Sequence, residues 1–380
     1  ASDVYKRQLV NGTLEKTARY LLYMFRRFPG LLPFALYLAS AGIAALGAGF
    51  FTVMAFMAPI ALLICEESNM DKLTGAVSIN CGALSGANFM TSGSGIIFRG
   101  LMEESGYADV SFRYSAAIFT ASVIFSLLFI VLFRFGTKNG RCIPQNASFE
   151  KPEPFTPLQI KNVYLMILMI GTVLIFPILH ILFPTADWIT FINSKMDVGL
   201  AAILFSAAAL FMKLAPQKEV LARVPWNTII MICGVGMLIQ VAVSAGTIDL
   251  LAAWAGSSLP VWLIPIAFSI VSAVMSFFSS TLGVVCPALF PLVPALSGAV
   301  GIPPLILFSC IVIGAQSSAI SPFSSGGSLI MGACTTDEER SHMFPRLLFQ
   351  AVPMSVIFAT LFNLVLSVIC LLYTSDAADD

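Results

Sequence analysis

The sequence predicts an all-α polytopic membrane protein, built as an inverted-topology repeat with two re-entrant hairpins and two broken transmembrane helices. Of its 380 residues, 58% are hydrophobic and 11% are charged, whereas an ordinary soluble domain carries roughly 25% charged residues. Several apolar runs approach the roughly 20 residues that a helix needs to cross a bilayer. A block of small and polar residues interrupts two of these runs at matching positions, and this duplication predicts the repeat.

The duplicated block occupies residues 82–95 and again 314–327, which is an offset of 232 residues. Six of its fourteen aligned positions are identical. The same offset also aligns proline, alanine and serine residues upstream of the block. These pairs are Pro33 with Pro265, Ala35 with Ala267, Ser40 with Ser272, Ala41 with Ala273, and Pro59 with Pro291. We therefore expect one structural module to occur twice.

The first repeat covers residues 9–134 and opens with a basic amphipathic segment, 13–28, typical of a helix lying on the membrane surface. Two apolar arms follow, each too short for a full span, and they meet at Gly47-Ala48-Gly49. Such arms predict a hairpin that enters the membrane and returns to the same side. The remaining elements are a broken span and a full span. These elements occupy 31–46 and 50–64 (hairpin), 73–87 and 95–103 (broken span), and 112–133 (full span).

A polar segment with several prolines, 135–161, predicts a linker. The second repeat, 162–370, contains three full spans, an interfacial stretch, a hairpin broken at Ser279-Ser280-Thr281, a broken span and a last full span. In order, these are 162–183, 196–213 and 226–245 (spans), 246–260 (interfacial), 261–278 and 282–297 (hairpin), 304–333 (broken span) and 347–370 (span).

The number of membrane crossings predicts the relative orientation of the repeats. Five crossings separate the two hairpins, and an odd number places the second repeat upside down relative to the first. The loops on one side carry 15 Lys and Arg residues, and those on the other carry three. The positive-inside rule then places the linker 135–161 in the cytoplasm and the C-terminus outside. We expect a multi-pass protein of a bacterial inner membrane, embedded in the lipid bilayer.

The two ends, residues 1–8 and 371–380, resemble translated sequencing-adapter read-through, and we interpret them as foreign tails. Residues 159–240 have no counterpart in the first repeat at the same offset. About three spans are therefore expected to be missing from the front of the first repeat.

The sequence also argues against several functional classes. The net charge is zero, so nothing indicates a nucleic-acid partner. The eight cysteines form no C-x-x-C pair and the two histidines lie far apart, so we expect no transition-metal site. Walker, His-Glu-x-x-His and Gly-x-Ser-x-Gly motifs are absent from the sequence. We therefore expect no enzyme, no catalytic residues and no cofactor other than a coupling ion.

The interrupted helices predict where the substrate and a coupling ion bind. A half-helix that begins near Ser94 or Ser328 directs N–H groups and the positive end of its dipole into the membrane, which suits a carboxylate. Half-helices that end near Asn88 and Ser317 offer carbonyl groups, which suit Na⁺. The candidate substrate ligands are Asn88, Thr91, Ser92, Ser94, Ser279, Ser280, Thr281, Ser321, Ser324, Ser325 and Ser328. A coupling Na⁺ is expected near Asn88, Gly49, Thr281 and Ser317.

Two alternatives stay open for these residues. Small residues also serve close packing of membrane helices, and each single serine can have that role. Arg99 is a candidate for attracting anions because it lies inside a short half-helix. Glu103, four residues later, can instead form a simple ion pair with Arg99.

With these motifs the chain resembles the ion transporter superfamily, and within it the divalent anion:sodium symporters and the malonate/dicarboxylate carrier-like permeases. The similarity covers about residues 9–370, and its most specific pieces are 82–101, 314–332, 276–294 and 225–238, where Pro225-Trp226 opens a span. The family's hairpin tips carry Ser-Asn-Thr, whereas both tips here lack the Asn that the family uses around Na⁺.

The resemblance implies an elevator-type secondary transporter with a mobile transport domain and a scaffold domain. Its expected substrates are small organic anions, di- or tricarboxylates, with Na⁺ coupling, and a homodimer is one possible assembly. Two other functions remain open at this point. One is a carrier of the same fold for a sulfonate, an oxyanion or an amino acid, and the other is a membrane receptor or enzyme without transport.

Overall fold

The computed structural model describes residues 29–136, 153–183, 198–212, 259–334 and 336–376, with isolated positions between them. Within these ranges the chain forms helices and turns and no strand. Several expected elements fall wholly or largely outside these ranges. They are the surface helix 13–28, the centre of the linker, the span 226–245, the interfacial stretch 246–260 and the tail 1–8.

The first repeat contains the expected hairpin, broken span and full span. The hairpin follows the turn η2 (Pro29–Leu31) and consists of α3 (Leu32–Ile43), the π-helical turn η3 (Ala44–Ala48) and α4 (Phe50–Glu67). The broken span consists of α5 (Lys72–Ala87) and α6 (Gly93–Glu104). The turn η4 (Ala108–Val110) leads into the full span α7 (Ser111–Gly136).

The second repeat contains the same elements after two further helices, α8 (Pro157–Leu182) and α10 (Val198–Phe211). The second hairpin consists of α14 (Leu263–Phe278), the π-helical turn η6 (Thr281–Val285), α15 (Cys286–Leu289) and α16 (Leu292–Val300). The second broken span consists of α17 (Pro304–Ser317) and α18 (Ser325–Ala333). The helix α19 (Asp337–Arg346), the π-helical turn η7 (Leu347–Ala351) and α20 (Val352–Asp376) follow, so helix extends into the segment interpreted as a C-terminal tail.

The helix starts keep the offset seen in the sequence. α5 begins at Lys72 and α17 at Pro304, and α6 begins at Gly93 and α18 at Ser325, so each pair is 232 residues apart. The local causes of the first two starts differ. The Asp71 carboxylate accepts a hydrogen bond of 3.2 Å from the Thr74 backbone N–H and caps α5. α17 instead begins with a proline, whose fixed φ suits the first helical position.

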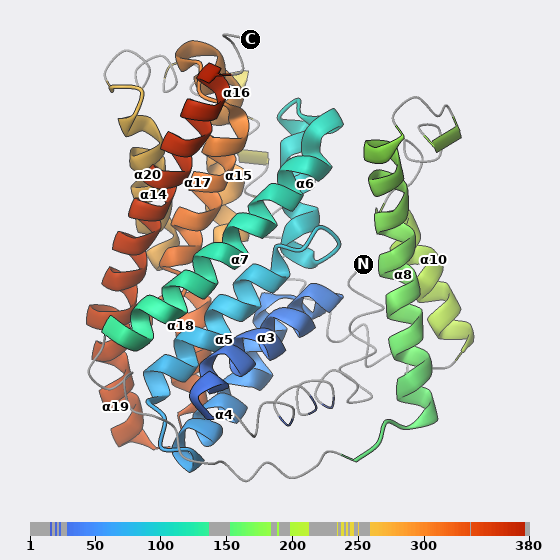
Figure 1. Ribbon diagram of the computed structural model, residues 1–380, viewed down its shortest axis with the longest axis vertical. Helices are drawn as coiled ribbons and strands as arrows, with labels where there is room; N and C mark the ends of the chain where they lie inside the picture. Colours follow the sequence, from blue (N-terminus) through green and yellow to red (C-terminus); the bar gives the residue numbers. More distant parts are fainter. Residues whose placement is uncertain are drawn as a thin grey trace.

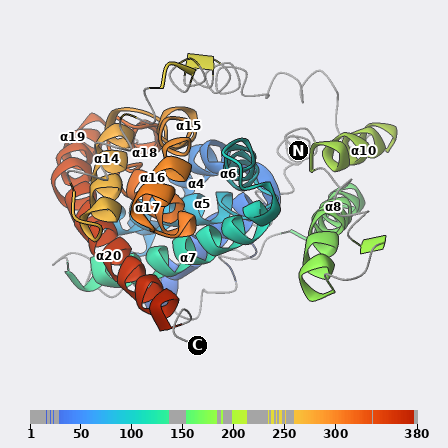
Figure 2. The ribbon, with the colours of Figure 1, turned by 90° about the horizontal axis from the view of Figure 1, so that it is seen from above.

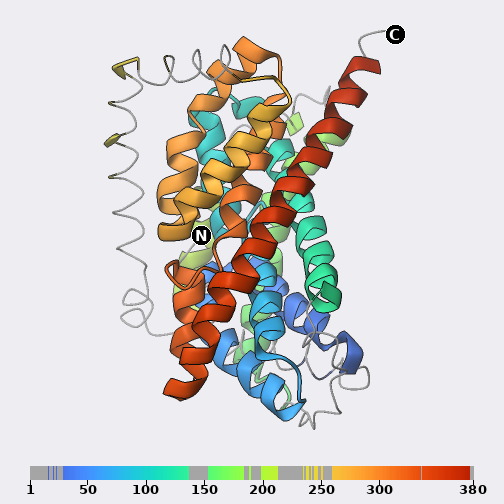
Figure 3. The same cartoon turned by 90° about the vertical axis from the view of Figure 1, so that its left-hand side faces the viewer.

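The two repeats run in opposite directions. From α5 to α6 the chain ascends in Figure 1, whereas from α17 to α18 it descends. The helices that follow are also opposed, because α7 descends and α20 ascends to the C-terminus (Figures 1 and 3). The first hairpin lies toward the lower end of the molecule and the second toward the upper end (Figure 1). This arrangement is the predicted inverted repeat with two re-entrant hairpins and two broken helices, and the fold class is confirmed.

The repeats are interlocked through two apolar cores. In one core, Ile320 of the second break and Ile330 of α18 pack with α3, α4 and α5 of the first repeat. In the other core, Phe98 and Met102 of α6 pack with the second hairpin and α17, where the Phe98 and Phe290 rings are 5.9 Å apart. Each second half-helix therefore packs against the hairpin of the other repeat. This exchange makes the two broken helices and both hairpins one packed unit.

Long apolar helices flank this unit. Within the described ranges, Ala108–Gly136 and Asp337–Ile369 are long and apolar enough to cross a membrane. The segments Thr281–Leu289 and Leu292–Val300 meet at a bend of 41° and could form a third crossing or a re-entrant element. α8 and α10 contact each other through Leu165 and Ala209 and lie apart from the packed unit, as Figures 1 and 2 show.

Candidate functional site

Both helix breaks have the same local geometry. Ser92 precedes α6 with φ −88° and ψ 168°, and Ser324 precedes α18 with φ −93° and ψ 169°. Two glycines in the first turn of these helices permit a close approach of the backbone. A Cβ on Gly95 would lie 2.1 Å from the Phe89 carbonyl oxygen, and one on Gly327 would lie 2.1 Å from the Ser321 carbonyl oxygen. Both half-helix N-termini therefore form in the same way.

A cavity lies where the breaks meet the second hairpin tip. Residues of both repeats line it, and none of those that the structure describes is charged. They are Phe50, Phe51, Leu84, Ser94, Ser276, Ser279, Ser280, Thr281, Leu282, Gln316, Ala319, Ser324, Ser325 and Gly326. The cavity volume is about 30 Å³, which is room for about two water molecules. Neutral hydroxyl and amide groups and the N-terminus of α18 thus converge on a narrow space.

The structure brings six of the eleven predicted substrate ligands to this cavity. They are Ser94, Ser279, Ser280, Thr281, Ser324 and Ser325. The other five lie elsewhere and do not line it. Thr91 and Ser321 are buried in the two breaks, Asn88 and Ser92 are buried among other elements, and Ser328 is exposed, with its hydroxyl donating to the Ser325 carbonyl at 2.9 Å.

The hydroxyl groups of the second hairpin tip are ordered by short-range hydrogen bonds. The Ser279 hydroxyl donates to the Met275 carbonyl at 2.6 Å, and the Ser280 hydroxyl accepts from the Gly283 N–H at 3.3 Å. The hydroxyls of Thr281 and Ser276 are 3.0 Å apart. These bonds leave oxygen lone pairs and, after a rotation of the side chain, O–H donors for a ligand in the cavity.

The first hairpin tip is built from backbone instead. Gly47 and Gly49 have φ angles of 96° and 76°, in the region that favours glycine. The Ala44 carbonyl of this tip accepts a hydrogen bond of 2.6 Å from the Ser92 hydroxyl. Ser92 therefore holds the first hairpin tip against the first break, and its hydroxyl proton is not available to the cavity.

Asn88 bridges the two repeats. Its side-chain nitrogen donates to the Ser122 hydroxyl at 2.8 Å and to Gln316 Oε1 at 3.1 Å, and its oxygen accepts from Gln316 Nε2 at 2.8 Å. The amide of Asn88 is fully engaged by these bonds. Gln316, by contrast, lines the cavity.

The four residues expected around Na⁺ occupy different surroundings. Thr281 lines the cavity, whereas the Ser317 hydroxyl donates to the Gly314 carbonyl at 2.6 Å and Asn88 is engaged with Gln316. Gly49 lies between the first tip and α4. In the described part of the chain, no group of three or more His, Cys, Asp or Glu residues could hold a metal ion. The described residues that line the cavity offer a cation hydroxyl, amide and carbonyl oxygens.

Arg99 lies outside the cavity lining. Its guanidinium is 3.6 Å from the Glu103 carboxylate and 5.6 Å from the centre of the Phe112 ring. The predicted ion pair is therefore present.

Sequence reasoning missed Gln316, Ser276 and the aromatic wall of Phe50 and Phe51. Gln316 had a signal, because it is a large polar residue within the duplicated block, where the first copy has Leu84. Ser276 and the two phenylalanines had none, because only the folded hairpins place them beside the breaks.

Comparisons with known proteins agree with this architecture. A model of the citrate transporter family matches residues 11–312. The fold is similar to the crystal structure of the Alcanivorax borkumensis YdaH transporter, described as having an unusual topology, with a TM-score of 0.52 and 16% sequence identity. That likeness covers 95% of this chain and 84% of that one. A search of curated proteins found no match.

The family match spans most of the chain, and the structural likeness supports the same type of fold. Together they confirm the resemblance to the ion transporter-type permeases and indicate a transporter, not an enzyme. The chain belongs to the citrate transporter family, and it is a membrane-embedded secondary transporter of citrate-like carboxylate anions.

Proposed function

We propose that this protein is an elevator-type symporter that carries citrate or a related di- or tricarboxylate together with a cation, Na⁺ in the first instance. The observation that carries the proposal is the all-neutral cavity at the second break. Its hydroxyl groups and the N-terminus of α18 suit a carboxylate. The six predicted ligands that line it are the proposed substrate-binding residues.

Charge balance supports coupling to a cation. A tricarboxylate carries up to three negative charges, and moving a charge out of water into a site of low dielectric is costly unless it is paired. None of the described residues that line the cavity is Lys or Arg, so among them helix dipoles and neutral donors face the anion. A co-bound Na⁺ near Thr281 would lower the net charge of the transported unit.

The size of the cavity supports a moving mechanism. A space for about two waters does not hold a tricarboxylate, so we propose that the tip of the second hairpin opens locally to admit the substrate before the larger movement. The interlocked cores tie both hairpins and both broken helices together, which favours movement as one body. We propose that this body is the transport domain and that α8 and α10 belong to the scaffold.

The orientation follows from charge alone. We propose that the segment 135–161 faces the cytoplasm of a bacterium, that the C-terminus faces outward, and that the protein works as a homodimer. A single-cysteine labelling series at loop positions, with a reagent that does not cross membranes, tests the orientation.

Uptake into proteoliposomes tests the function. We expect radiolabelled citrate to accumulate when Na⁺ is higher outside, and not when K⁺ replaces Na⁺ on both sides. Accumulation driven equally well by a pH gradient without Na⁺ would overturn the choice of ion. Competition with succinate, malonate, a sulfonate, sulfate and an amino acid defines the substrate class. Complete inhibition by a non-carboxylate, with no uptake of citrate, would contradict the proposal.

A further inference from the structure

We propose that Gln316 contacts the transported carboxylate and that Asn88 is a positioning residue that acts through Gln316. The inference rests on the proposed function and adds to it a residue and a device that link the two repeats. It also assigns Asn88 a different role from the direct ligand that the sequence predicts.

The geometry is a reciprocal pair of side-chain amides. Gln316 Nε2 donates to Asn88 Oδ1 at 2.8 Å, and Asn88 Nδ2 donates back to Gln316 Oε1 at 3.1 Å. The two residues are 228 positions apart and belong to opposite repeats. Both are buried, with 0% of Asn88 and 7% of Gln316 exposed. The pair therefore forms where the first half of each broken helix ends.

A count of donors shows which amide remains available. An amide group carries two N–H donors. Asn88 uses one on Gln316 and the other on the Ser122 hydroxyl at 2.8 Å. Gln316 uses one on Asn88, and its second N–H makes no hydrogen bond among the described residues. Because Gln316 also lines the cavity, this second donor is the one that can reach a ligand.

The pairing has an energetic consequence. A free glutamine side chain loses rotamer entropy when it is fixed in one conformation. Asn88, itself held by Ser122, fixes the Gln316 side chain before the substrate binds. A hydrogen bond from Gln316 to the substrate therefore adds more to affinity than one from a freely rotating side chain. A donor held ready in this way also distinguishes a carboxylate, which accepts hydrogen bonds, from a cation.

A double-mutant cycle on the KM for citrate in proteoliposomes tests the proposal. We expect Gln316→Met, which keeps the size and removes the donor, to raise KM about 10-fold or more. Asn88→Leu should raise KM several-fold, with Ser122→Ala having a smaller effect in the same direction. If Asn88 acts through Gln316, adding Asn88→Leu to Gln316→Met should not raise KM further.

Asn363 provides the matched control. Its buried amide donates to the Ser269 hydroxyl at 2.8 Å but lies outside the cavity, so Asn363→Leu should lower thermal stability and leave KM unchanged. If Gln316→Met does not fold, Gln316→Asn keeps the amide but shortens its reach, and the same rise in KM is expected.

The outcomes separate the inference from the function on which it rests. Absence of citrate uptake by the unaltered protein overturns the proposed function. Normal uptake with an unchanged KM in a folded Gln316 variant overturns the role of Gln316. Additive effects of the two substitutions overturn the positioning role of Asn88.

Discussion

The two broken helices have the same backbone geometry at their breaks but differ in the side chains that they present to the cavity. Their helix starts keep one offset, and Ser92 and Ser324 have nearly equal backbone angles. A Cβ on Gly82 would lie 2.3 Å from the Tyr37 carbonyl oxygen, and one on Gly314 would lie 2.4 Å from that of Ser269. Tyr37 and Ser269 are themselves 232 residues apart. The repeated sequence therefore specifies where each hairpin approaches its broken helix.

The cavity lining does not follow this symmetry. The first repeat contributes four residues, namely Phe50, Phe51, Leu84 and Ser94, and only Ser94 among them has a polar side chain. The second repeat contributes ten, including all three hydroxyl residues of its hairpin tip and Gln316. At the corresponding places the first repeat has Gly47 and Gly49 at its tip and Leu84 in its block. Matched positions thus give the two breaks the same backbone geometry, whereas most of the polar residues that line the cavity come from the second repeat.

The prediction with the largest expected effect tests whether the two breaks have the same backbone geometry. We predict that Gly95→Ala and Gly327→Ala each lower stability by about 3 kcal/mol. The new methyl group would lie 2.1 Å from a backbone carbonyl oxygen in both repeats, and the backbone cannot yield without opening the break. Thermal unfolding of the purified protein in detergent measures the change, and both variants should behave alike.

Gly100 and Gly332 give a matched pair of controls. They lie at the same offset, in α6 and α18, and a Cβ at either position meets nothing within 4 Å. Alanine there should keep stability or raise it by up to about 1 kcal/mol, because alanine favours helix. A strong loss in only one of Gly95→Ala and Gly327→Ala would show that the two breaks are not equivalent.

The second prediction tests the difference between the repeats. Ser325 in the first turn of α18 lines the cavity, and its counterpart in the first repeat is Gly93, which does not. We expect Ser325→Ala to raise the KM for citrate about 10-fold, the typical effect of losing a hydrogen bond to a charged group. Ser328→Ala, one turn later and outside the cavity, should leave KM unchanged. Equal effects of the two would place the substrate elsewhere on α18.

The sequence predicted the fold well because the repeat is a global constraint. A duplicated block with one offset predicted both breaks, and the element order predicted the inversion. It did not predict the bend of 41° after Leu289 in the second hairpin. Pro291 lies in the break between the two bent segments, whereas its counterpart Pro59 lies within the continuous helix α4. Identical residues at matched positions therefore give different helices, because tertiary packing decides whether a proline interrupts the helix.

The site was predicted less completely for a physical reason. Composition identifies hydroxyl residues near a break, but Ser92 and Ser324 look alike in sequence. In the structure Ser92 donates to the Ala44 carbonyl of the first hairpin, and Ser324 lines the cavity while donating to the Ala319 carbonyl at 2.5 Å. Which hydroxyl faces a ligand depends on contacts between segments far apart in the chain, and no local pattern records these contacts.

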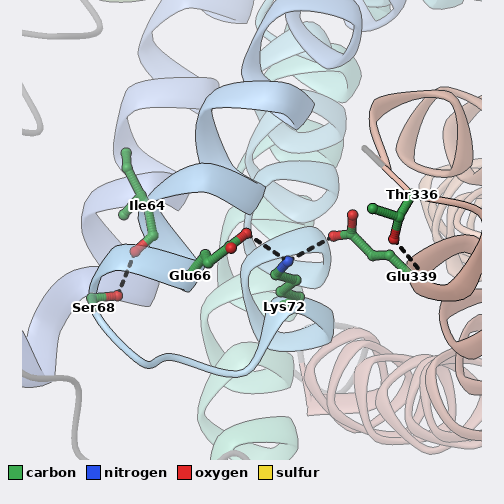
Figure 4. A network of polar contacts seen from close by, with 6 residues as sticks. All are labelled: Ile64, Glu66, Ser68, Lys72, Thr336 and Glu339. Carbon is green, nitrogen blue, oxygen red and sulfur yellow. Dashed lines mark hydrogen bonds and ion pairs between the residues drawn. The ribbon is translucent and has the colours of Figure 1, made fainter.

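A further contrast between the repeats lies at the turn that precedes each broken helix. The junction from α4 into α5, residues 66–72, carries Glu66, Glu67, Asp71 and Lys72, whereas the matched residues 298–304 have no charged side chain. The Lys72 ammonium pairs with both the Glu66 and the Glu339 carboxylates, as Figure 4 shows, and each N–O distance is 2.9 Å. The Arg346 guanidinium lies 2.8 Å from Asp71. Among the described residues, ion pairs therefore link the first repeat to α19 at the junction between α4 and α5.

The smallest expected effect concerns this link. Burial lowers the pKa of Lys72, but hydrogen bonds to Glu339 and Glu66 outweigh it, so the pKa is raised above its ordinary value of 10.5. The stabilising contribution of Lys72 is complete below the ordinary value and is lost as the pH rises through the raised one. Because both partners are partly exposed, Glu339→Gln should cost about 1 kcal/mol or less at neutral pH.

Salt and a control substitution sharpen this last prediction. Raising NaCl from 0.1 to 1 M, which shortens the screening length from about 10 to about 3 Å, should reduce the difference in melting temperature between Glu339→Gln and the unaltered protein. Asp337→Asn is the matched control on the same helix, because Asp337 is 99% exposed in its pair with Arg340, and it should have almost no effect. A difference for Glu339→Gln that persists in 1 M NaCl would mean that Glu339 stabilises the junction by packing rather than by its charge.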